Sequence, residues 1–304
     1  LIQKNLSFSE LNKLSYIGDP AIKFHKSQKR VYPQHNIFSH LTGLKTEEIS
    51  SKLERNLDQQ LSNGEDIKLT VDLRVQNIVR DEVKNSIEKY NAKAGLAVVM
   101  NVNNGEIISM VSLPDFNPNY PESILPKTEN NLATEARYEM GSTLKIFNAA
   151  IVYELQSDLQ NNIYNIAEGY QITGKKNITD DHIQNDHLTF EEIFIKSSNV
   201  GSVKILDSVG YHAQEEIFRK VGLKENLFVK GVKVVPNKLP INWGLYSRFI
   251  SYGYGVSVSP ISLITAFSTL VNGGFRINPT LIKRKNYDEK QKVLSNQTSK
   301  KINQ

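Results

Sequence analysis

The sequence predicts an α+β protein in which a helical body packs with an antiparallel β-hairpin. Two apolar runs, residues 96–100 and 106–111, flank an Asn-Gly pair, which is the strongest short-range signal for a hairpin. Most other patterned segments repeat their apolar residues at helical spacing. Strands and helices do not alternate along the chain, which argues against a doubly wound fold. Two strands do not make an independent sheet, so we expect further strands.

The composition is that of a globular protein and excludes several kinds of site. The 304 residues, about two domains by length, contain 39% hydrophobic residues and no cysteine. Without cysteine there is no disulfide scaffold, zinc-thiolate site, iron–sulfur cluster or cysteine nucleophile. The net charge of +5 comes from interleaved acidic and basic residues, which predicts a solvated surface and no nucleic-acid partner. No apolar run reaches the roughly 18 residues that cross a bilayer, but the chain opens with Leu1 rather than Met, and we expect a fragment.

Residues 1–68 are predicted to form a small accessory domain. They lack sustained periodicity except over residues 49–61, where a leucine or isoleucine recurs at every fourth position. This spacing predicts one short amphipathic helix. A turn signal at Asn63-Gly64 follows, and the patterning changes near residue 68, where we place the domain boundary.

The main domain is predicted over residues 69–304. Residues 68–71 alternate like a strand, and Asp72 is suited to cap a helix that runs to about Tyr90. Beyond the hairpin and a proline-rich loop, helices are predicted over residues 141–155, 188–210, 213–221 and 260–270. The first of these is apolar on most sides and should be buried. The polar tail beyond Leu281 is predicted to be solvated or disordered.

Ser142-Thr143-Leu144-Lys145 is the central chemical feature of this domain. Residues three apart share a helix face, with Cβ atoms roughly 5–6 Å apart, so the Lys145 amine can reach the Ser142 hydroxyl. A serine becomes a nucleophile when a base takes its proton, and a lysine can be that base only if its pKa falls through burial or a nearby cation. The apolar helix around Lys145 favours burial. Gly141 permits a tight turn that places Ser142 at a helix N-terminus, where the dipole favours negative charge.

The spacing alone is weak evidence, because about one chance match is expected in a chain of this length. Ser86 and Lys89 supply such a match deep inside an amphipathic helix. No glycine precedes Ser86, and Glu88 neighbours the lysine. We therefore interpret this second copy as a decoy.

Ser197-Ser198-Asn199 is the second chemical feature. Ser197 could pass a proton to a leaving amine, and Asn199 could bind a substrate amide or the lysine amine. Serine and asparagine are also favoured helix caps, so a purely structural role remains open from these residues alone.

Together these residues resemble the penicillin-binding protein family, whose motifs are S-x-x-K, S-x-N and K-T-G. Residues 138–145 (YEMGSTLK) are similar to that family's active-serine segment. Residues 30–33 (RVYP) resemble the start of the pedestal region of class B members, and residues 69–76 (LTVDLRVQ) resemble the entry into their transpeptidase domain. Residues 197–201 (SSNVG) and 252–260 (YGYGVSVSP) are similar to the division-type subgroup.

The resemblance implies a penicillin-binding/β-lactamase-like transpeptidase domain behind a pedestal domain. It implies that Ser142 attacks the penultimate D-alanine of a peptidoglycan stem peptide while Lys145 accepts the proton. Ser197 would help protonate the departing D-alanine, and an amine of a neighbouring stem would resolve the ester into a crosslink. β-Lactam antibiotics would acylate the same serine.

The resemblance also implies supporting roles for three residues, and the sequence departs from the family pattern at two points. Asn199 would complete the S-x-N motif, and Tyr252 and Tyr254 would line the cleft. Met140 stands where the family usually has proline. No K-T-G or K-S-G occurs, so we expect this motif and its strands beyond Gln304, the alternative being an inactive homologue.

The acidic and histidine residues Asp180-Asp181-His182 and Asp186-His187 suggest a metal site. The spacing fits no standard ligand pattern, and we predict a polar loop, no metal and no cofactor. The Gly253 and Gly255 pair lacks the context of a phosphate loop and is interpreted as allowing close backbone packing.

The prediction is a D,D-transpeptidase of septal wall synthesis, held by a single-pass anchor before Leu1 in the bacterial inner membrane with its domain in the periplasm. Its expected partners are a membrane-embedded glycan polymerase and other division proteins. The alternatives are a D,D-carboxypeptidase or β-lactamase of the same superfamily, and a non-catalytic β-lactam sensor or scaffold. No residue is clearly placed to activate water, which disfavours a β-lactamase.

Overall fold

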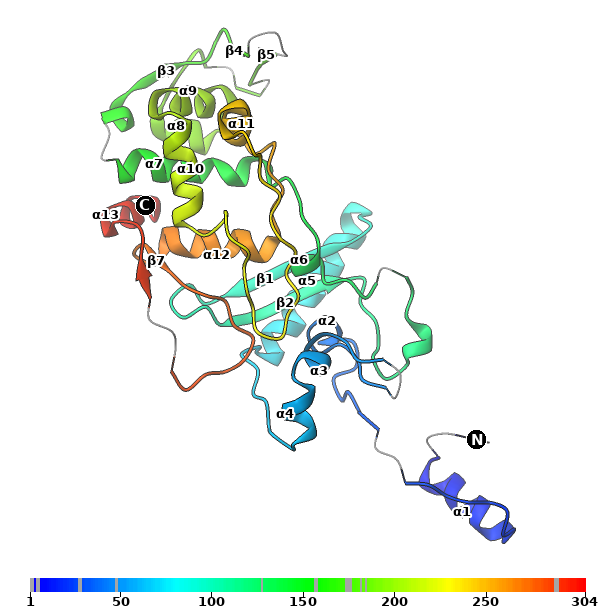
Figure 1. The fold of residues 1–304 in the computed structure, drawn as a ribbon. Helices are drawn as coiled ribbons and strands as arrows, with labels where there is room; N and C mark the ends of the chain where they lie inside the picture. The colour runs from blue at the N-terminus through cyan, green and yellow to red at the C-terminus, as the bar shows by residue number, and fades with distance from the viewer. Residues whose placement is uncertain are drawn as a thin grey trace.

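The fold is α+β, as predicted, with a helical half, a β-hairpin flanked by helices, and a helix α1 (Phe8–Ile17) that lies apart from the rest (Figure 1). The computed structural model describes residues 3, 6–26, 29–46, 49–126, 128–155, 158–172, 177–180, 182–183, 185–286 and 290–304. Helix α12 (Pro260–Val271) lies between the hairpin and the helical half. Its Ile261 packs into the core under the hairpin and its Leu270 into the helical core, so one helix joins both.

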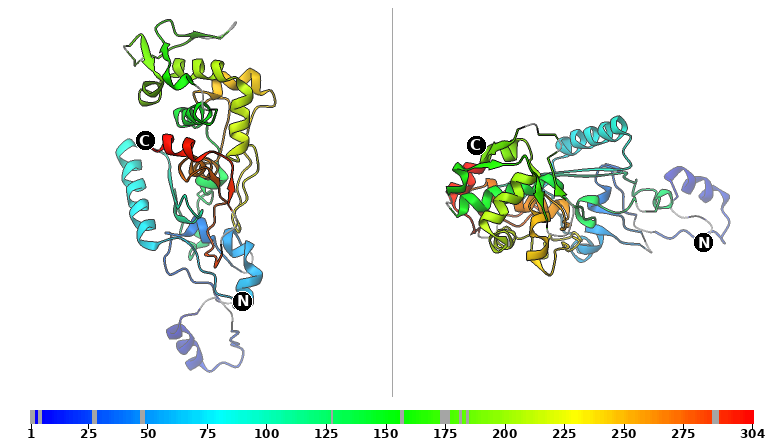
Figure 2. Two further views of the ribbon diagram at one scale, coloured as in Figure 1. Left: turned by 90° about the vertical axis from the view of Figure 1, so that its left-hand side faces the viewer. Right: turned by 90° about the horizontal axis from the view of Figure 1, so that it is seen from above.

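The predicted hairpin is confirmed as strands β1 (Gly95–Met100) and β2 (Ile107–Leu113), which pair antiparallel. Helix α5 (Leu73–Tyr90) lies along it (Figure 2). The buried Gln76 side chain fastens the helix to the strand, because it donates to the Met110 carbonyl and accepts from the Met110 N–H, both at 3.0 Å.

Asp72 caps α5, as predicted: its carboxylate accepts the backbone N–H groups of Arg74 and Val75. The predicted strand at residues 68–71 is wrong. Only a single bridge between Leu69 and Ile282 forms there, because this segment runs beside residues 281–283 for too short a distance to make a ladder.

The helical half is built around Phe147, which is fully buried. Its ring lies 5.4 Å from that of Phe218 and 5.6 Å from that of Phe267. The helices of this half, besides α12, are α7 (Ile146–Glu154), α8 (Phe190–Ile195), α9 (Asn199–Val209), α10 (Tyr211–Lys220), α11 (Trp243–Ile250) and α13 (Asn296–Ile302). A mostly apolar α7 at the centre of this core agrees with the burial that its sequence predicts.

The remaining strands are short and pair two by two. The sequence predicts that further strands exist, but it does not predict their positions. They form the antiparallel pairs β3 (Ile163–Asn165) with β6 (His187–Thr189), β4 (Tyr170–Gln171) with β5 (Asn177–Ile178), and β7 (Phe275–Arg276) with β8 (Gln291–Lys292). Strands of two or three residues are too short to show an alternating pattern.

The prediction of a solvated or disordered tail beyond Leu281 is wrong for residues 294–302, whereas residues 283, 285, 286 and 290–292 are exposed. Helix α13 begins at a Ser295 cap and packs on α7 and α12. Leu294 and Thr298 are buried, and the Glu154 carboxylate accepts hydrogen bonds from the Ser295 N–H and the Thr298 hydroxyl. A polar segment is thus held by specific partners that its composition does not reveal.

The single helix predicted over residues 49–61 is also wrong. The chain forms α3 (Lys52–Asn56) and α4 (Asp58–Ser62), which are separated at Leu57. Leu53 and Leu57 are both buried, as the four-residue step implies, but the chain bends between them. The other short helical elements outside the active-serine segment are α2 (Ser39–Thr42), α6 (Leu132–Glu135) and the 3₁₀ turns at Pro121–Ser123 and Asp158–Asn161.

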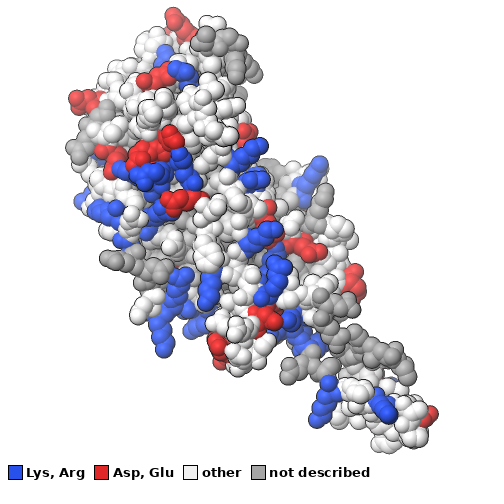
Figure 3. All heavy atoms as spheres, viewed as in Figure 1, with Lys and Arg blue, Asp and Glu red and all other residues white. Residues whose placement is uncertain are grey.

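Charged side chains of both signs are interspersed over the face shown in Figure 3. No helix among the described residues is both long and apolar enough to cross a bilayer.

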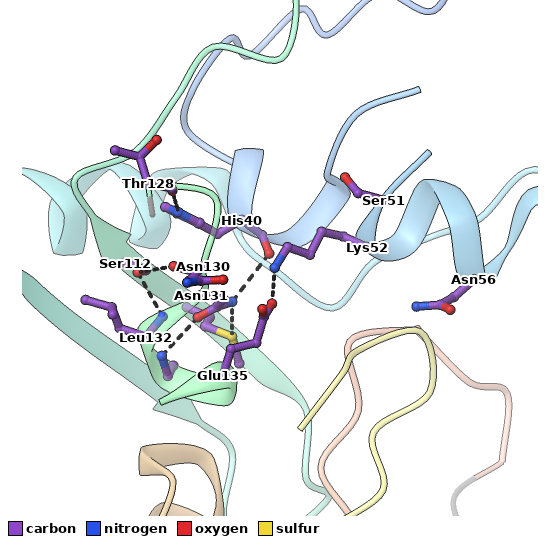
Figure 4. A network of polar contacts seen from close by, with 12 residues as sticks. His40, Ser51, Lys52, Asn56, Ser112, Thr128, Asn130, Asn131, Leu132 and Glu135 are labelled. Carbon is purple, nitrogen blue, oxygen red and sulfur yellow. Dashed lines mark hydrogen bonds and ion pairs between the residues drawn. The ribbon is translucent and has the colours of Figure 1, made fainter. Parts of the chain in front are cut away.

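A polar network joins the first 68 residues to the helix α6 (Figure 4). The Lys52 amine pairs with the Glu135 carboxylate, and both side chains are less than a fifth exposed. The His40 ring nitrogen Nε2 lies 2.6 Å from the Thr128 carbonyl, and the buried Asn131 side chain donates to the His40 carbonyl. Because α6 leads directly into the Ser142 segment, this network fixes where that segment begins.

The ion pair of Lys52 and Glu135 should stabilise the protein far more than a surface pair. Lys52→Met keeps the aliphatic stem but leaves a nearly buried carboxylate unpaired, so we expect the free energy of unfolding to fall by about 2–4 kcal/mol. The control is Lys45→Met, because Lys45 pairs with Asp58 at 2.7 Å with both side chains at least a third exposed. Loss of this surface pair should lower the free energy of unfolding by less than about 1 kcal/mol. Urea titration measures the free energy of unfolding of both variants. Equal losses would contradict the assignment.

Candidate active site

The segment that carries Ser142 is held from behind by residues 253–258. Tyr138 and Val258 exchange two backbone hydrogen bonds of 3.0 Å, and the Gly141 N–H donates to the Gly253 carbonyl at 3.1 Å. Gly253 has a φ of 102°, and a Cβ atom added to it would lie 1.8 Å from the Gly141 carbonyl oxygen. The close packing predicted for this glycine is therefore confirmed, and only glycine fits this contact.

Ser142 lies in a 3₁₀ turn, Gly141–Lys145, that leads into α7. The sequence predicted a continuous helix here, and the structure tightens its first turn. Side chains three apart eclipse one another in a 3₁₀ helix, so Ser142 and Lys145 lie on one side of the turn. Ser142 is exposed, and its hydroxyl has no hydrogen-bond partner within the described part of the chain.

Lys145 carries a buried amine. The residue is 3% exposed, and Nζ donates to the Ser197 hydroxyl at 3.0 Å and to the Ser197 carbonyl. Burial lowers the pKa of Lys145 to about 8, although the negative charge of Asp180 acts in the opposite direction. At pH 7 about one amine in ten is then neutral, against about one in 3,000 for an ordinary lysine. The structure thus supplies the condition that a lysine base requires.

Ser197 sits at a sharp corner between α8 and α9. Its φ of 57° is left-handed, a conformation that costs a non-glycine residue about 1–3 kcal/mol and persists only where its surroundings impose it. The corner aims the exposed Ser197 hydroxyl at Lys145 rather than along the helix. Strain of this kind is common at functional sites.

The S-x-N segment, residues 197–199, could serve either as a helix cap or as chemical groups, and the structure shows which residue is the cap. The N-cap of α9 is Ser198, whose hydroxyl accepts the Gly201 N–H at 2.8 Å. Ser197 and Asn199 are therefore not the cap. The Asn199 side-chain amide is half-buried and has no hydrogen-bond partner among the described residues, which leaves it available to a ligand.

Asp180 completes this corner, and the sequence analysis considered it only as a metal ligand. Its carboxylate accepts the Asn199 N–H at 2.6 Å and the Ser198 hydroxyl. It approaches from the loop after β5, and no local pattern links that loop to α9. Asp181 of the same cluster lies outside the described residues, and the described ones contain no group of three His, Asp or Glu side chains that could hold a metal ion.

Tyr252 and Tyr254 flank Gly253, whose carbonyl holds the serine turn. Their rings lie 5.5 Å apart. Tyr252 is half-buried against the core of α8 and α9, and burial raises the pKa of its phenol, which stays protonated. Tyr254 is 51% exposed and free to meet a ligand. Ser86 and Lys89, by contrast, are exposed near the C-terminal end of α5, so the decoy lies less deep in its helix than its sequence indicated.

The comparisons with known proteins show the family to which this chain belongs. Residues 95–304 match the family described as the penicillin binding protein transpeptidase domain. The chain belongs to this family. It is 29% identical, over 97% of its length and 51% of the relative's, to a probable peptidoglycan D,D-transpeptidase FtsI of Caulobacter vibrioides. It is 31% identical, over 79% of its length and 40% of the relative's, to stage V sporulation protein D of Bacillus subtilis.

Solved structures of this family share the fold. Penicillin-binding protein A from M. tuberculosis, solved as an imipenem acyl-enzyme complex, superimposes with a TM-score of 0.78 at 20% identity, over 90% of this chain and 74% of that one. The chain spans about half the length of the curated relatives it matches.

Gly253 should be required for the position of the nucleophile. In Gly253→Ala the added methyl group displaces Gly141, so we expect acylation by a fluorescent penicillin to slow at least about tenfold, because small displacements of reacting groups are costly. Gly210→Ala is the control, because Gly210 also has a positive φ, of 83°, but an added Cβ meets nothing within 4 Å. Wild-type acylation in Gly253→Ala would show that the contact does not position Ser142.

Proposed function

We propose that this protein is a serine-type D,D-transpeptidase that crosslinks peptidoglycan stem peptides and is acylated by β-lactams. The observation that carries the proposal is the buried Lys145 amine, bonded to Ser197 and one 3₁₀ turn from an exposed Ser142. A nucleophile, a base of lowered pKa and a second hydroxyl within reach of that base are what acyl transfer through serine requires.

The reaction proceeds in two halves. Ser142 Oγ attacks the carbonyl carbon of the penultimate D-alanine, and its proton passes to the neutral Lys145 amine. The C–N bond then breaks, and the proton reaches the departing D-alanine amine through Ser197. In the second half an amine of a neighbouring stem peptide attacks the ester carbonyl carbon and forms a new amide. The ester C–O bond breaks, and the proton that the amine loses passes to the Ser142 oxygen.

Charge on the carbonyl oxygen needs a hydrogen-bond donor. The backbone N–H of Ser142 lies in the first turn of its helix, where amides have no intrahelical acceptor. This N–H supplies one oxyanion donor, and the loss of one such donor typically costs about 10²–10³ in rate. Asn199 and Tyr254, which both present unpaired or exposed groups beside the site, bind the stem peptide.

The division-type role is part of the proposal. Support comes from the resemblance of residues 197–201 and 252–260 to the division-type subgroup and from the relative named FtsI. In this role the domain works in the periplasm beside a membrane-embedded glycan polymerase and other division proteins, as part of a protein anchored in the inner membrane.

Ser142 should be the residue that a penicillin modifies. Ser142→Ala removes the nucleophile, so we expect labelling of the full-length protein by fluorescent penicillin to disappear, with the wild-type adduct mapped to Ser142 by mass spectrometry. Ser86→Ala, in the exposed decoy motif, should label normally. Full labelling of Ser142→Ala would show that another residue is the nucleophile.

The rate of acylation should follow the ionisation of Lys145. Because only the neutral amine accepts a proton, the second-order rate constant should rise about tenfold per pH unit below pH 8 and level off above it, since burial holds the pKa of Lys145 at about 8. Stopped-flow acylation between pH 6 and 9.5 measures this profile. Lys145→Ala should abolish the reaction while the protein stays folded. A rate independent of pH across this range would rule out Lys145 as the base.

A further inference from the structure

We propose that Asp180 is a positioning residue of this active site, which holds the Ser197–Asn199 corner in place and sets the electrostatic environment of Lys145. The proposal rests on the proposed acyl transfer through Ser142. Among the described residues, Asp180 forms no hydrogen bond with Ser142 or Lys145; it binds the residues that follow Ser197 and acts on Lys145 through its charge.

The first part of the role is geometric. The Asp180 carboxylate accepts hydrogen bonds from the Ser198 hydroxyl, from the Asn199 N–H at 2.6 Å and from the Val200 N–H at 3.3 Å. These donors belong to the first residues of α9 and its cap, so the carboxylate also meets the positive end of the helix dipole. Hydrogen bonds to a charged acceptor are roughly twice as strong as neutral ones. They can balance the strain at the left-handed Ser197, which lies just ahead of them.

The position of Asp180 is fixed by the strands that precede it. It lies two residues after β5, whose Ile178 is buried in the core formed with α8 and α9. The partner strand β4 carries Tyr170, whose hydroxyl donates to Asp207 on α9 and accepts from Arg248 on α11 at 2.9 Å. The strand pair that precedes Asp180 is thus bound to α9 and α11 through Tyr170.

The second part of the role is electrostatic. Burial lowers the pKa of Lys145, and the negative charge of Asp180 raises it. Burial raises the pKa of the nearby Tyr252 phenol, which stays protonated at neutral pH. Several other charged groups on the surrounding elements have partners of their own: Glu139 with the Gly255 N–H, Glu192 with Lys196, Asp207 with Arg248, Glu154 with Lys220, and Lys204 with the Asn165 carbonyl. Asp180 therefore limits how far burial alone would lower the basicity of Lys145.

The two parts of the role predict different pH dependences. Loss of geometry slows acylation by the same factor at every pH. Loss of the charge moves the acid limb of the profile toward lower pH, because Lys145 then loses its proton more readily. Asp180→Asn keeps an acceptor oxygen for the Asn199 N–H but removes the charge, whereas Asp180→Ala removes both.

The test is the pH profile of acylation by fluorescent penicillin, measured on the full-length wild type, Asp180→Asn and Asp180→Ala. For Asp180→Ala we expect a rate at least about tenfold lower at pH 9. For Asp180→Asn we expect the ratio of its rate to the wild-type rate to be at least about threefold higher at pH 6 than at pH 9. Asp72→Asn is the matched control, because Asp72 also caps a helix with its carboxylate but lies on α5, and its profile should superimpose on the wild type.

A ratio for Asp180→Asn that is constant with pH would overturn the electrostatic role, and wild-type rates in both variants would overturn the positioning role. Melting temperatures identify any variant that is unfolded, and the conservative Asp180→Asn then carries the test. A wild-type protein labelled at Ser142 together with unchanged variants contradicts Asp180 alone. A wild type that is not labelled contradicts the proposed function itself.

Discussion

The contact between the Lys145 amine and Ser197 is the interaction on which the site depends. It joins the start of α7 to the corner between α8 and α9, two places 52 residues apart in the chain. A fully buried ammonium group would be costly, and hydrogen bonds to the hydroxyl and carbonyl of one residue reduce that cost only in part. The remaining cost appears as a lowered pKa, which is the property a general base needs.

Two further contacts hold the serine turn against residues 251–253. Asn148, on the next turn of α7, donates to the Ser251 carbonyl at 2.7 Å, and Gly141 bonds the Gly253 backbone. Both acceptors belong to the short segment between α11 and α12. These contacts fix the turn that carries Ser142 and Lys145 beside Tyr252 and Tyr254, which would suit a reaction that tolerates little displacement.

Much of the site could be predicted because its signal is local. Ser142 and Lys145 are three residues apart, so any helical conformation places them on one side, and the 3₁₀ turn does so more strictly than an α-helix. The hairpin and the Asp72 cap are local in the same sense. Spacing alone did not exclude the decoy at Ser86. The choice of Ser142 and the roles of the other residues therefore depended on the resemblance of the surrounding segments to a known family.

Two of the errors came from tertiary contacts between polar groups. Composition marked the C-terminal tail as solvated, yet Glu154 on α7 binds Ser295 and Thr298 and holds α13 in the fold. The same limitation hid Asp180, whose partners on α9 lie across an intervening strand and helix. Apolar periodicity reports which face is buried, but it does not report which polar group will find which donor.

Residues that lower the stability of the fold are gathered in one place, which distinguishes a candidate site from the supporting structure. Ser197 is strained, Asn199 keeps an unused amide, and Lys145 is buried with its basicity lowered; none of these features stabilises the fold. They persist because the surrounding cores, centred on Phe147 in one cluster and on Phe190 in another, are fully buried and resist rearrangement. Such costs are expected to be tolerated where they serve chemistry, and their meeting at one corner is the physical reason to place the reaction there.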